Sequence, residues 1–144
     1  MSIFTPARAP WPSRALSVLR IASGLLFITF GTMKIFGWPT VAQPMPPMPP
    51  FSQMWIGGWM EIIGGLLIAI GLFTRPVAFI LAGEMAVAYF QFHFPQGFWP
   101  QRNMGIGAVM YCWLFLYFAV AGPGEWSVDA AIAPPRRARE LVNS

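Results

Sequence analysis

The stretch IGGWMEIIGGLLIAIGLF, residues 56–73, is apolar apart from one carboxylate, Glu61. A helix needs about 20 mostly apolar residues to cross a bilayer, so this stretch is almost long enough alone. The apolar run from Val77 to Phe92 contains a second acid, Glu84. A charge at the centre of a membrane span costs roughly 2.5–3.5 kcal/mol on insertion scales. Both acids therefore mark a candidate site.

The composition of the chain indicates a polytopic membrane protein. Its 144 residues fit one domain, and 56% are hydrophobic but only 10% charged, whereas soluble domains are about 25% charged. The net charge of +4 does not indicate nucleic-acid binding, because the arginines are scattered over span ends and tails. Cys112 is the single cysteine. It excludes an internal disulfide, and we interpret it as a packing residue.

Four apolar stretches predict an all-α membrane protein, a bundle of four transmembrane helices. The predicted spans cover residues 16–36, 55–73, 76–92 and 104–121. Thr74-Arg75-Pro76 separates the second and third spans, which predicts a tight helical hairpin. We expect a membrane domain over residues 16–130. A cytoplasmic segment, 1–15, precedes it and a basic cytoplasmic tail, 131–144, follows it.

Lysine and arginine residues predict the orientation of this bundle. An even number of spans puts both termini on one side. That side would collect Arg8, Arg14, Arg75, Arg136, Arg137 and Arg139. The other side has only Arg102 and, at a span end, Lys34. Because cytoplasmic loops are enriched in Lys and Arg, we expect both termini in the cytoplasm, and the basic tail in contact with anionic lipid headgroups.

The loop over residues 38–54 contains the proline-methionine strap QPMPPMPP, residues 43–50. Prolines favour an extended polyproline II conformation. The strap is either a linker lying over the outer face of the bundle or a lid or docking surface for a partner.

Helical periodicity places the charges of each span on its small-residue face, because spacings of three, four and seven residues share a face. On the first span this face consists of Arg20, Gly24, Phe27, Gly31 and Lys34. On the second span Glu61 lies between two glycine pairs, Gly57-Gly58 and Gly64-Gly65. Small residues let helices approach closely in membranes. The charges should therefore face protein rather than lipid.

The third span places Glu84, Ala88 and Gln91 on one face. His93 would lie on the opposite side if the helix continued, so we expect it in the outer loop. Gln91, His93 and Asn103 are candidate site residues on the outer side. The predicted packing stripe of the fourth span is Gly105, Ala108, Cys112 and Leu116.

Depth in the membrane predicts how the charges pair. Lys34 lies near the outer end of the first span, and Glu61 lies about 9 Å from the outer end of the second. The long Lys34 side chain can bend to meet it, so we expect this ion pair. Arg20, near the cytoplasmic end, could pair with Glu84 or reach the headgroups. Without a cationic partner, Glu84 would be neutral, because desolvation disfavours its charged form.

Two interpretations of this intramembrane polar site, Arg20, Lys34, Glu61 and Glu84, remain open. The charges are either structural, as an ion pair and a buried neutral acid, or they line a cavity that binds a polar headgroup, a quinone carbonyl or protons. One histidine, no cysteine pair and two separated acids do not make a metal site.

Several motifs, in this order, resemble the DoxX family over roughly residues 16–130. They are Arg20-x-x-x-Gly24 with Gly31-x-x-Lys34; EIIGGLLIAIGLFTRP, residues 61–76; GEMAVAYF, residues 83–90, with HFPQGF, residues 93–98; YCWLFLY, residues 111–117; and GPGEWSVD, residues 122–129. The resemblance implies a four-helix protein of the bacterial inner membrane that is linked to redox machinery. Family members usually carry Asn-Gly-Gly-Glu at the start of the fourth span, where this chain has Asn103-Met104-Gly105-Ile106. The missing acid favours an accessory subunit over an autonomous enzyme.

We therefore expect a small inner-membrane protein that acts as a subunit or accessory of a quinone-linked redox complex. It would have no intrinsic cofactor but could contact a quinone, and its partners would be the lipid bilayer and other membrane subunits. One alternative is a non-catalytic structural subunit of a larger membrane assembly. Another is a carrier of small molecules or lipids, although four short helices leave little room for an aqueous path.

Overall fold

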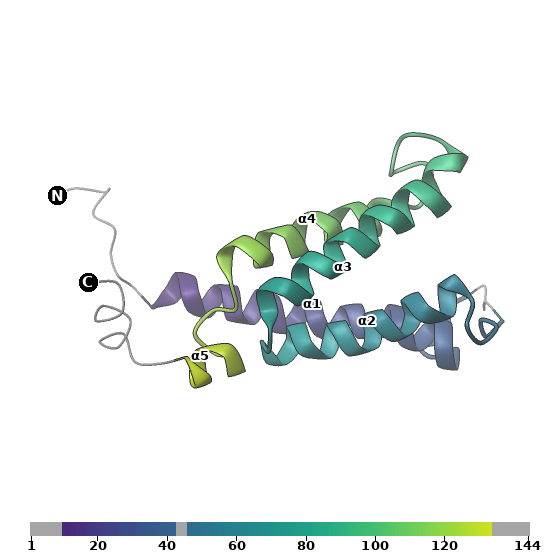
Figure 1. Cartoon of the computed structure of the whole chain (residues 1–144). Helices are drawn as coiled ribbons and strands as arrows, with labels where there is room; N and C mark the ends of the chain where they lie inside the picture. The colour runs from purple at the N-terminus through teal and green to yellow at the C-terminus, as the bar shows by residue number, and fades with distance from the viewer. Residues whose placement is uncertain (1–9, 43–45, 134–144) are drawn as a thin grey trace.

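The computed structural model describes residues 10–42 and 46–133, and the regular elements within these residues are helical (Figure 1). They are α1 (Trp11–Phe36), α2 (Gln53–Ile70), α3 (Thr74–Ala88), the π-helical turn η1 (Tyr89–His93), the 3-10 turn η2 (Phe94–Gln96), α4 (Ile106–Ala121) and the short α5 (Val128–Ile132). Three parts of the chain treated above lie outside the described residues: the start of the N-terminal segment, residues 43–45 of the strap, and the basic tail from residue 134.

Within residues 10–42 and 46–133, three helices are long and apolar enough to cross a membrane: α1, α2, and α3 together with the two turns that extend it to Gln96. The fourth, α4, is a shorter apolar helix of 16 residues. The helices thus lie where the sequence predicts them, with shifted ends. For example, α1 already begins at Trp11, and α2 ends at Ile70 because Gly71 adopts a left-handed conformation with φ 72°.

The predicted hairpin between α2 and α3 is confirmed, but its turn lies earlier than expected. The Gly71 N–H donates to the carbonyl oxygens of Leu67 and Ile68, at 2.9 and 3.1 Å. Because α3 begins at Thr74, Arg75 and Pro76 belong to its first turn and do not separate the helices. Proline is well tolerated in a first turn, where its missing N–H has no intrahelical partner to lose.

The helices form two pairs, α1 with α2 and α3 with α4, which diverge toward one end (Figure 1). The other end, called here the closed end, contains the start of α1, the α2–α3 turn and α5. The diverging end, called the open end, contains the end of α1, the start of α2 and η1. Both limits of the described chain, residues 10 and 133, lie at the closed end (Figure 1).

Glycines set the close packing of α1 on α2, as predicted. A Cβ atom on Gly24 would lie 2.7 Å from the backbone nitrogen of Ala69, and one on Gly65 would lie 3.0 Å from the Gly24 carbonyl oxygen. Neither contact is sterically acceptable. The helices approach this closely only because these positions lack side chains, and the Arg20–Lys34 face of α1 therefore lies against α2.

The core of the bundle is aromatic. The predicted stripe of α4 packs against this core, but two phenylalanines that it omits are the most buried residues of the helix. On α4, Phe115 and Phe118 are fully buried, and Tyr111 packs beside them. Of the predicted stripe, Gly105 is buried, and Ala108, Cys112 and Leu116 are partly buried against the core. The Phe27 and Phe115 rings lie edge to face at 4.8 Å. Large side chains therefore fill the wider space around α4, which small residues would leave empty.

Candidate functional site

Lys34 and Glu61 form the predicted ion pair between α1 and α2. The Lys34 Nζ atom lies 2.6 Å from Glu61 Oε1. Glu61 is only 2% exposed, whereas the Lys34 side chain retains 19% exposure. A Cβ on Gly58 would lie 3.1 Å from Lys34 Cβ, so this glycine gives the lysine room to lie along α2. The pair is charge-assisted and short.

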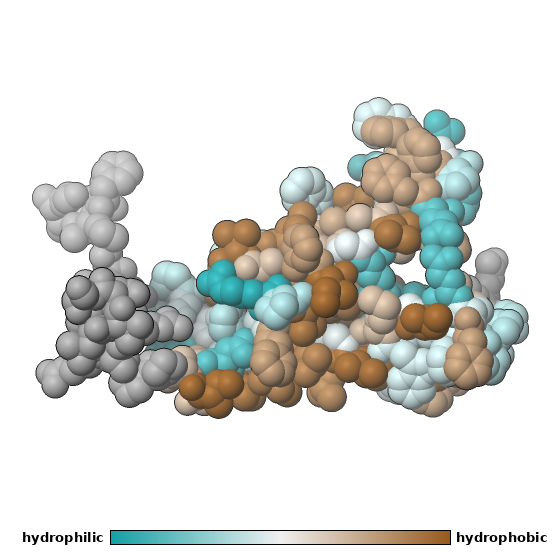
Figure 2. All heavy atoms as spheres, in the orientation of Figure 1, coloured by the Kyte–Doolittle hydropathy of each residue, from teal (hydrophilic) through white to brown (hydrophobic). Residues whose placement is uncertain are grey.

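The pair borders a cavity of about 550 Å³ between the two helical pairs. Residues from all four long helices and η1 line it, and most of them are apolar or aromatic, among them Phe27, Phe30, Met85 and Tyr111. Figure 2 shows that the molecule is hollowed at the open end, with hydrophilic residues beside the hollow. A mostly apolar cavity with a few convergent polar groups is the usual form of a small-molecule site.

Glu84 extends from α3 into this cavity and has no cationic partner among the described residues. Its Oε1 atom lies beside Gly57, where a Cβ would be 3.2 Å away. Its Oε2 atom is buried and makes no hydrogen bond, and the same holds for Glu61 Oε2. Buried polar groups are normally hydrogen-bonded. The cavity thus presents two carboxylate oxygens with unused hydrogen-bonding capacity.

His93 belongs to a helical turn and lines the cavity, so the prediction that it lies in the outer loop is wrong. The helix continues through His93 as the π turn η1. A π turn is wider than an α turn, so the register after Ala88 changes and His93 lines the same cavity as Glu84. Its Nδ1 atom lies 3.0 Å from the Asn103 carbonyl oxygen. Such π turns often occur at functional sites.

The other two outer-side candidates have structural contacts. Gln91 and Gln53 exchange two hydrogen bonds of 2.6 and 3.0 Å between η1 and the start of α2. Asn103 is buried, and its amide donates to the Gly97 carbonyl oxygen at 2.7 Å and accepts from the Gly105 N–H at 2.8 Å. Asn103 therefore fixes the loop before α4, and the glutamine pair bridges the open end.

Arg20 contacts neither Glu84 nor solvent, so both predicted roles are wrong. It is fully buried at the closed end. Its guanidinium donates to the carbonyl oxygens of Ile68, Ala69, Pro123 and Trp126. The first two lie in the last turn of α2, where carbonyls lack the i+4 N–H donors of a continuing helix. Arg20 thus terminates α2 and ties the segment after α4 to it.

Two further side chains complete the closed end. Arg75 donates to the Ala119 and Val120 carbonyl oxygens at the end of α4, and Asp129 accepts from the Phe73 and Thr74 N–H groups at the start of α3, both at 2.8 Å. Burial by itself would raise the pKa of the Asp129 carboxyl, but the hydrogen bonds from Thr74 and Phe73 and the charge of Arg20 outweigh it and hold this pKa below its usual value.

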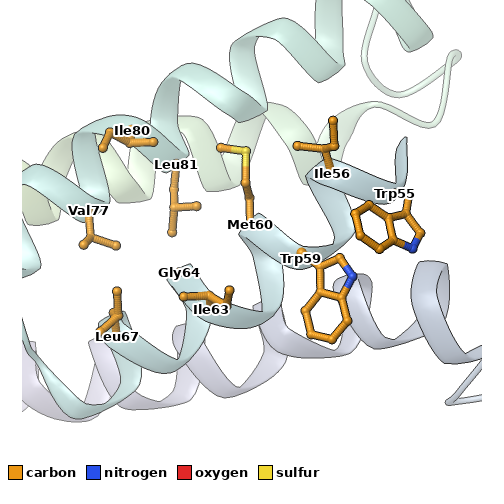
Figure 3. A pocket seen from close by; sticks show the side chains of 10 residues that line it. All are labelled: Trp55, Ile56, Trp59, Met60, Ile63, Gly64, Leu67, Val77, Ile80 and Leu81. Atoms are coloured by element: carbon orange, nitrogen blue, oxygen red, sulfur yellow. The ribbon is translucent and has the colours of Figure 1, made fainter. Parts of the chain in front are cut away.

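A second, wholly apolar groove of about 440 Å³ runs between α2 and α3 on the outer surface of the bundle (Figure 3). It extends from Trp55 and Trp59 at the open end to Leu67 and Val77. Nothing in the sequence analysis predicted it. The signal was nonetheless present, because Ile56, Met60, Ile63 and Leu67 follow one another at helical spacing.

Within the described residues, no three His, Cys, Asp or Glu side chains gather in a way that would hold a metal ion. The polar side chains that line the cavity are a lysine with unused N–H donors, two carboxyl groups, an imidazole, the Tyr111 phenol and the Gln53 amide. Such a set can bind hydrogen-bonding groups and exchange protons.

The fold and this site define the class of the protein: a multi-pass, all-helical membrane protein with an ionic site inside its bundle. The sequence model of the DoxX family matches residues 15–94, which include α2, α3 and most of α1. The chain belongs to the DoxX family, as its motifs indicated.

Three relatives support this assignment. An uncharacterized protein of Haemophilus influenzae is 39% identical over 125 residues, covering 79% of this chain and 87% of its own. The inner membrane proteins YphA and YqjF of Escherichia coli K12 are 32% identical over 127 residues and 35% identical over 118 residues. These matches cover 79% and 78% of this chain and 87% of each relative. No solved structure matches the chain. The protein is thus a multi-pass protein of the bacterial inner membrane.

Proposed function

We propose that the protein binds the head of a lipid-soluble quinone in the cavity at the open end and serves as an accessory subunit of a membrane redox complex. One observation carries this proposal: the Lys34–Glu61 pair and Glu84 border a single cavity whose remaining walls are largely apolar and aromatic. A quinone head has the same character, with two carbonyl oxygens on a flat apolar ring.

The groups in the cavity fit such a head. Lys34 has three N–H donors and uses one of them on Glu61 Oε1, so another can be donated to a carbonyl oxygen. The Oε2 atoms of Glu61 and Glu84 are unpartnered and can accept a hydrogen bond or, when protonated, donate one. The rings of Phe27 and Tyr111, whose centroids lie 5.0 Å apart, form an aromatic wall of the cavity.

When bound, a quinone would carry electrons and protons through the membrane. The side chains of this chain would hold the head and exchange protons with it. Glu84 is the preferred candidate for proton exchange, because it has no ion-pair partner among the described residues. The electrons would come from a partner subunit. This division of tasks makes the protein an accessory rather than an autonomous enzyme.

The proposal includes an orientation. With α4 as a fourth span, both limits of the described chain, residues 10 and 133, would lie on the closed-end side, and the arginine bias favours the cytoplasm for that side. The quinone site would then lie in the outer half of the membrane. Reporter fusions to the C-terminus and to the loop over residues 93–103 test this orientation: cytoplasmic and periplasmic signals, respectively, are expected, and the reverse pattern would contradict it.

The binding test uses the full chain, purified in mild detergent and depleted of native quinone. Decylubiquinone should bind saturably to the wild-type protein, and Glu84→Gln and Lys34→Met should weaken binding by about tenfold each, as expected for loss of one well-placed hydrogen bond. Arg14→Met serves as the matched control, because Arg14 contacts Glu125 at the surface, away from the cavity. Absence of saturable binding would remove the quinone proposal and favour a non-catalytic interaction subunit.

A further inference from the structure

The outer groove between α2 and α3 adjoins the polar cavity. Two residues, Ile56 and Met60, line both of them. They are four residues apart and so lie on the same face of α2. Figure 3 shows both side chains extending from α2 into the space in front of α3. The partition between the lipid-facing groove and the cavity is therefore formed on the α2 side by these two side chains.

The partition lies between two helices that pack loosely on each other. Against α3, α2 packs far less extensively than it does against α1, and α3 and α4 also pack closely on each other. Figure 1 shows α2 and α3 diverging toward the open end. Methionine is unbranched, with three rotatable bonds, and adapts its shape readily. Met60 can therefore move aside without disturbing the closely packed helix pairs.

Other sides of the cavity are bridged by side-chain contacts between described residues. Between α1 and α4, the Phe27 and Phe30 rings pack against Tyr111, with centroids 5.0 and 5.8 Å apart. At the closed end, Arg20 and Asp129 join the ends of α2 and α3 to the segment after α4. At the open end, Gln53 and Gln91 are hydrogen-bonded across the space between α2 and η1. The α2–α3 crevice has no polar contact of this kind at Met60.

We propose that the amphipathic ligand enters the cavity sideways from the lipid, between α2 and α3 past Met60, and leaves its hydrocarbon tail in the outer groove. This inference rests on the proposed function, which supplies the head group in the cavity. The groove suits a tail because its lining is wholly apolar. From Ile56 to Leu67 it follows about 17 Å of helix at 1.5 Å per residue.

The groove should govern the rate of binding more than the affinity. Lipid hydrocarbon solvates a tail nearly as well as a row of Ile, Leu and Val side chains does, so seating the tail gains little free energy. Passage of the head past Met60 is the step that the protein controls. A bulky side chain at position 60 should therefore slow association.

The test has two arms on the full-length protein in lipid nanodiscs. In the first, a decyl benzoquinone with a diazirine at the end of its tail is photolysed with the wild-type protein. Cross-links to groove residues such as Ile63, Leu67 and Ile80, which unlabelled decylubiquinone suppresses, are the expected result. Saturable binding with tail cross-links confined to the loop over 93–103 or to α4 would overturn lateral access and leave the quinone site intact.

In the second arm, Met60→Trp should slow decylubiquinone association by about tenfold, equivalent to a small added barrier. The matched control is Leu66→Trp, an exposed position on the same helix that lines neither the groove nor the cavity. It should change the rate by less than about twofold. Equal association rates in all three proteins would contradict lateral entry. If Met60→Trp does not fold, the cross-linking arm provides the test.

If neither decylubiquinone nor the tailless duroquinone binds the wild-type protein, the proposed quinone-binding function itself is contradicted, rather than the route of entry.

Discussion

Lys34→Met should strongly destabilise the protein, because it removes the cation that pairs with the buried Glu61 carboxylate. It leaves the Glu61 carboxylate 2% exposed and without the cation that lies 2.6 Å away in the native protein. Removing one partner of a buried pair typically costs about 3–5 kcal/mol. Glu61→Gln should cost less, about 1–2 kcal/mol, because the Gln oxygen can still accept from Lys34 and this lysine borders the cavity.

The double variant Lys34→Met/Glu61→Gln separates the interaction from its two components. It leaves no buried charge unpaired, and replacing a buried pair by uncharged groups is often nearly neutral. We therefore expect the double variant to be more stable than Lys34→Met alone, with an interaction free energy of at least about 2 kcal/mol in the double-mutant cycle. The assay is equilibrium unfolding in mixed micelles with increasing SDS, followed by tryptophan fluorescence.

The surface pair Arg14–Glu125 provides the control cycle. Its atoms are 3.3 Å apart and its side chains are 37% and 44% exposed, so its interaction free energy should be below about 1 kcal/mol. Additive effects of Lys34→Met and Glu61→Gln, within about 0.5 kcal/mol, would refute the reasoning. They would mean that water in the cavity screens the pair as well as it screens the surface pair.

Three further outcomes are expected. Gly24→Ala should destabilise the protein by about 1–3 kcal/mol in the same unfolding assay, since its Cβ would overlap the α2 backbone; Gly83→Ala, whose Cβ meets nothing within 4 Å, should be neutral or slightly stabilising. Arg20→Lys should increase amide hydrogen exchange in the last turn of α2, because an ammonium cannot reach four carbonyls, and unchanged exchange would contradict the clamp. The folded pKa of Asp129 is lowered, so this carboxylate contributes stability above its unfolded pKa, and the stability is lost as pH falls through the folded pKa. Hydrogen exchange at the Thr74 N–H should therefore rise on acidification in the wild-type protein. In Asp129→Asn, exchange at this N–H should follow only the intrinsic pH dependence of exchange.

The Lys34–Glu61 pair could be predicted from sequence because both residues lie on glycine-rich faces of regular helices. Their faces follow from the helical repeat, and their depths follow from counting residues at 1.5 Å each. The packing face of α4 could also have been predicted from the sequence, because Tyr111, Phe115 and Phe118 recur at helical spacing. The predicted stripe followed the small-residue rule of the α1–α2 interface; it packs against the core but omits these aromatic residues.

The contacts of Arg20 and the position of His93 could not be predicted in this way. Arg20 binds backbone carbonyls, and every residue has one, so the sequence around its partners carries no distinguishing side chain. His93 depends on a π turn, which changes the register by a fraction of a turn and has no strong composition of its own. Extrapolation at 100° per residue fails at such a turn.

The distribution of unsatisfied polar atoms is the strongest reason to regard the open end as a binding site rather than as a structural element. Four buried side-chain atoms lack a partner among the described residues: Trp59 Nε1, Thr74 Oγ1, Glu61 Oε2 and Glu84 Oε2. Leaving a buried hydroxyl or indole N–H without a hydrogen bond destabilises a protein by about 1–3 kcal/mol, and leaving a buried charged group without one destabilises it more. The two carboxyl oxygens both belong to residues that line the same cavity. The closed end shows that this fold can satisfy a buried charge completely, since all three nitrogens of Arg20 are hydrogen-bonded. A bundle that had only to be stable would treat Glu84 in the same way. Its free oxygen therefore supports the proposal that Glu84 binds a ligand.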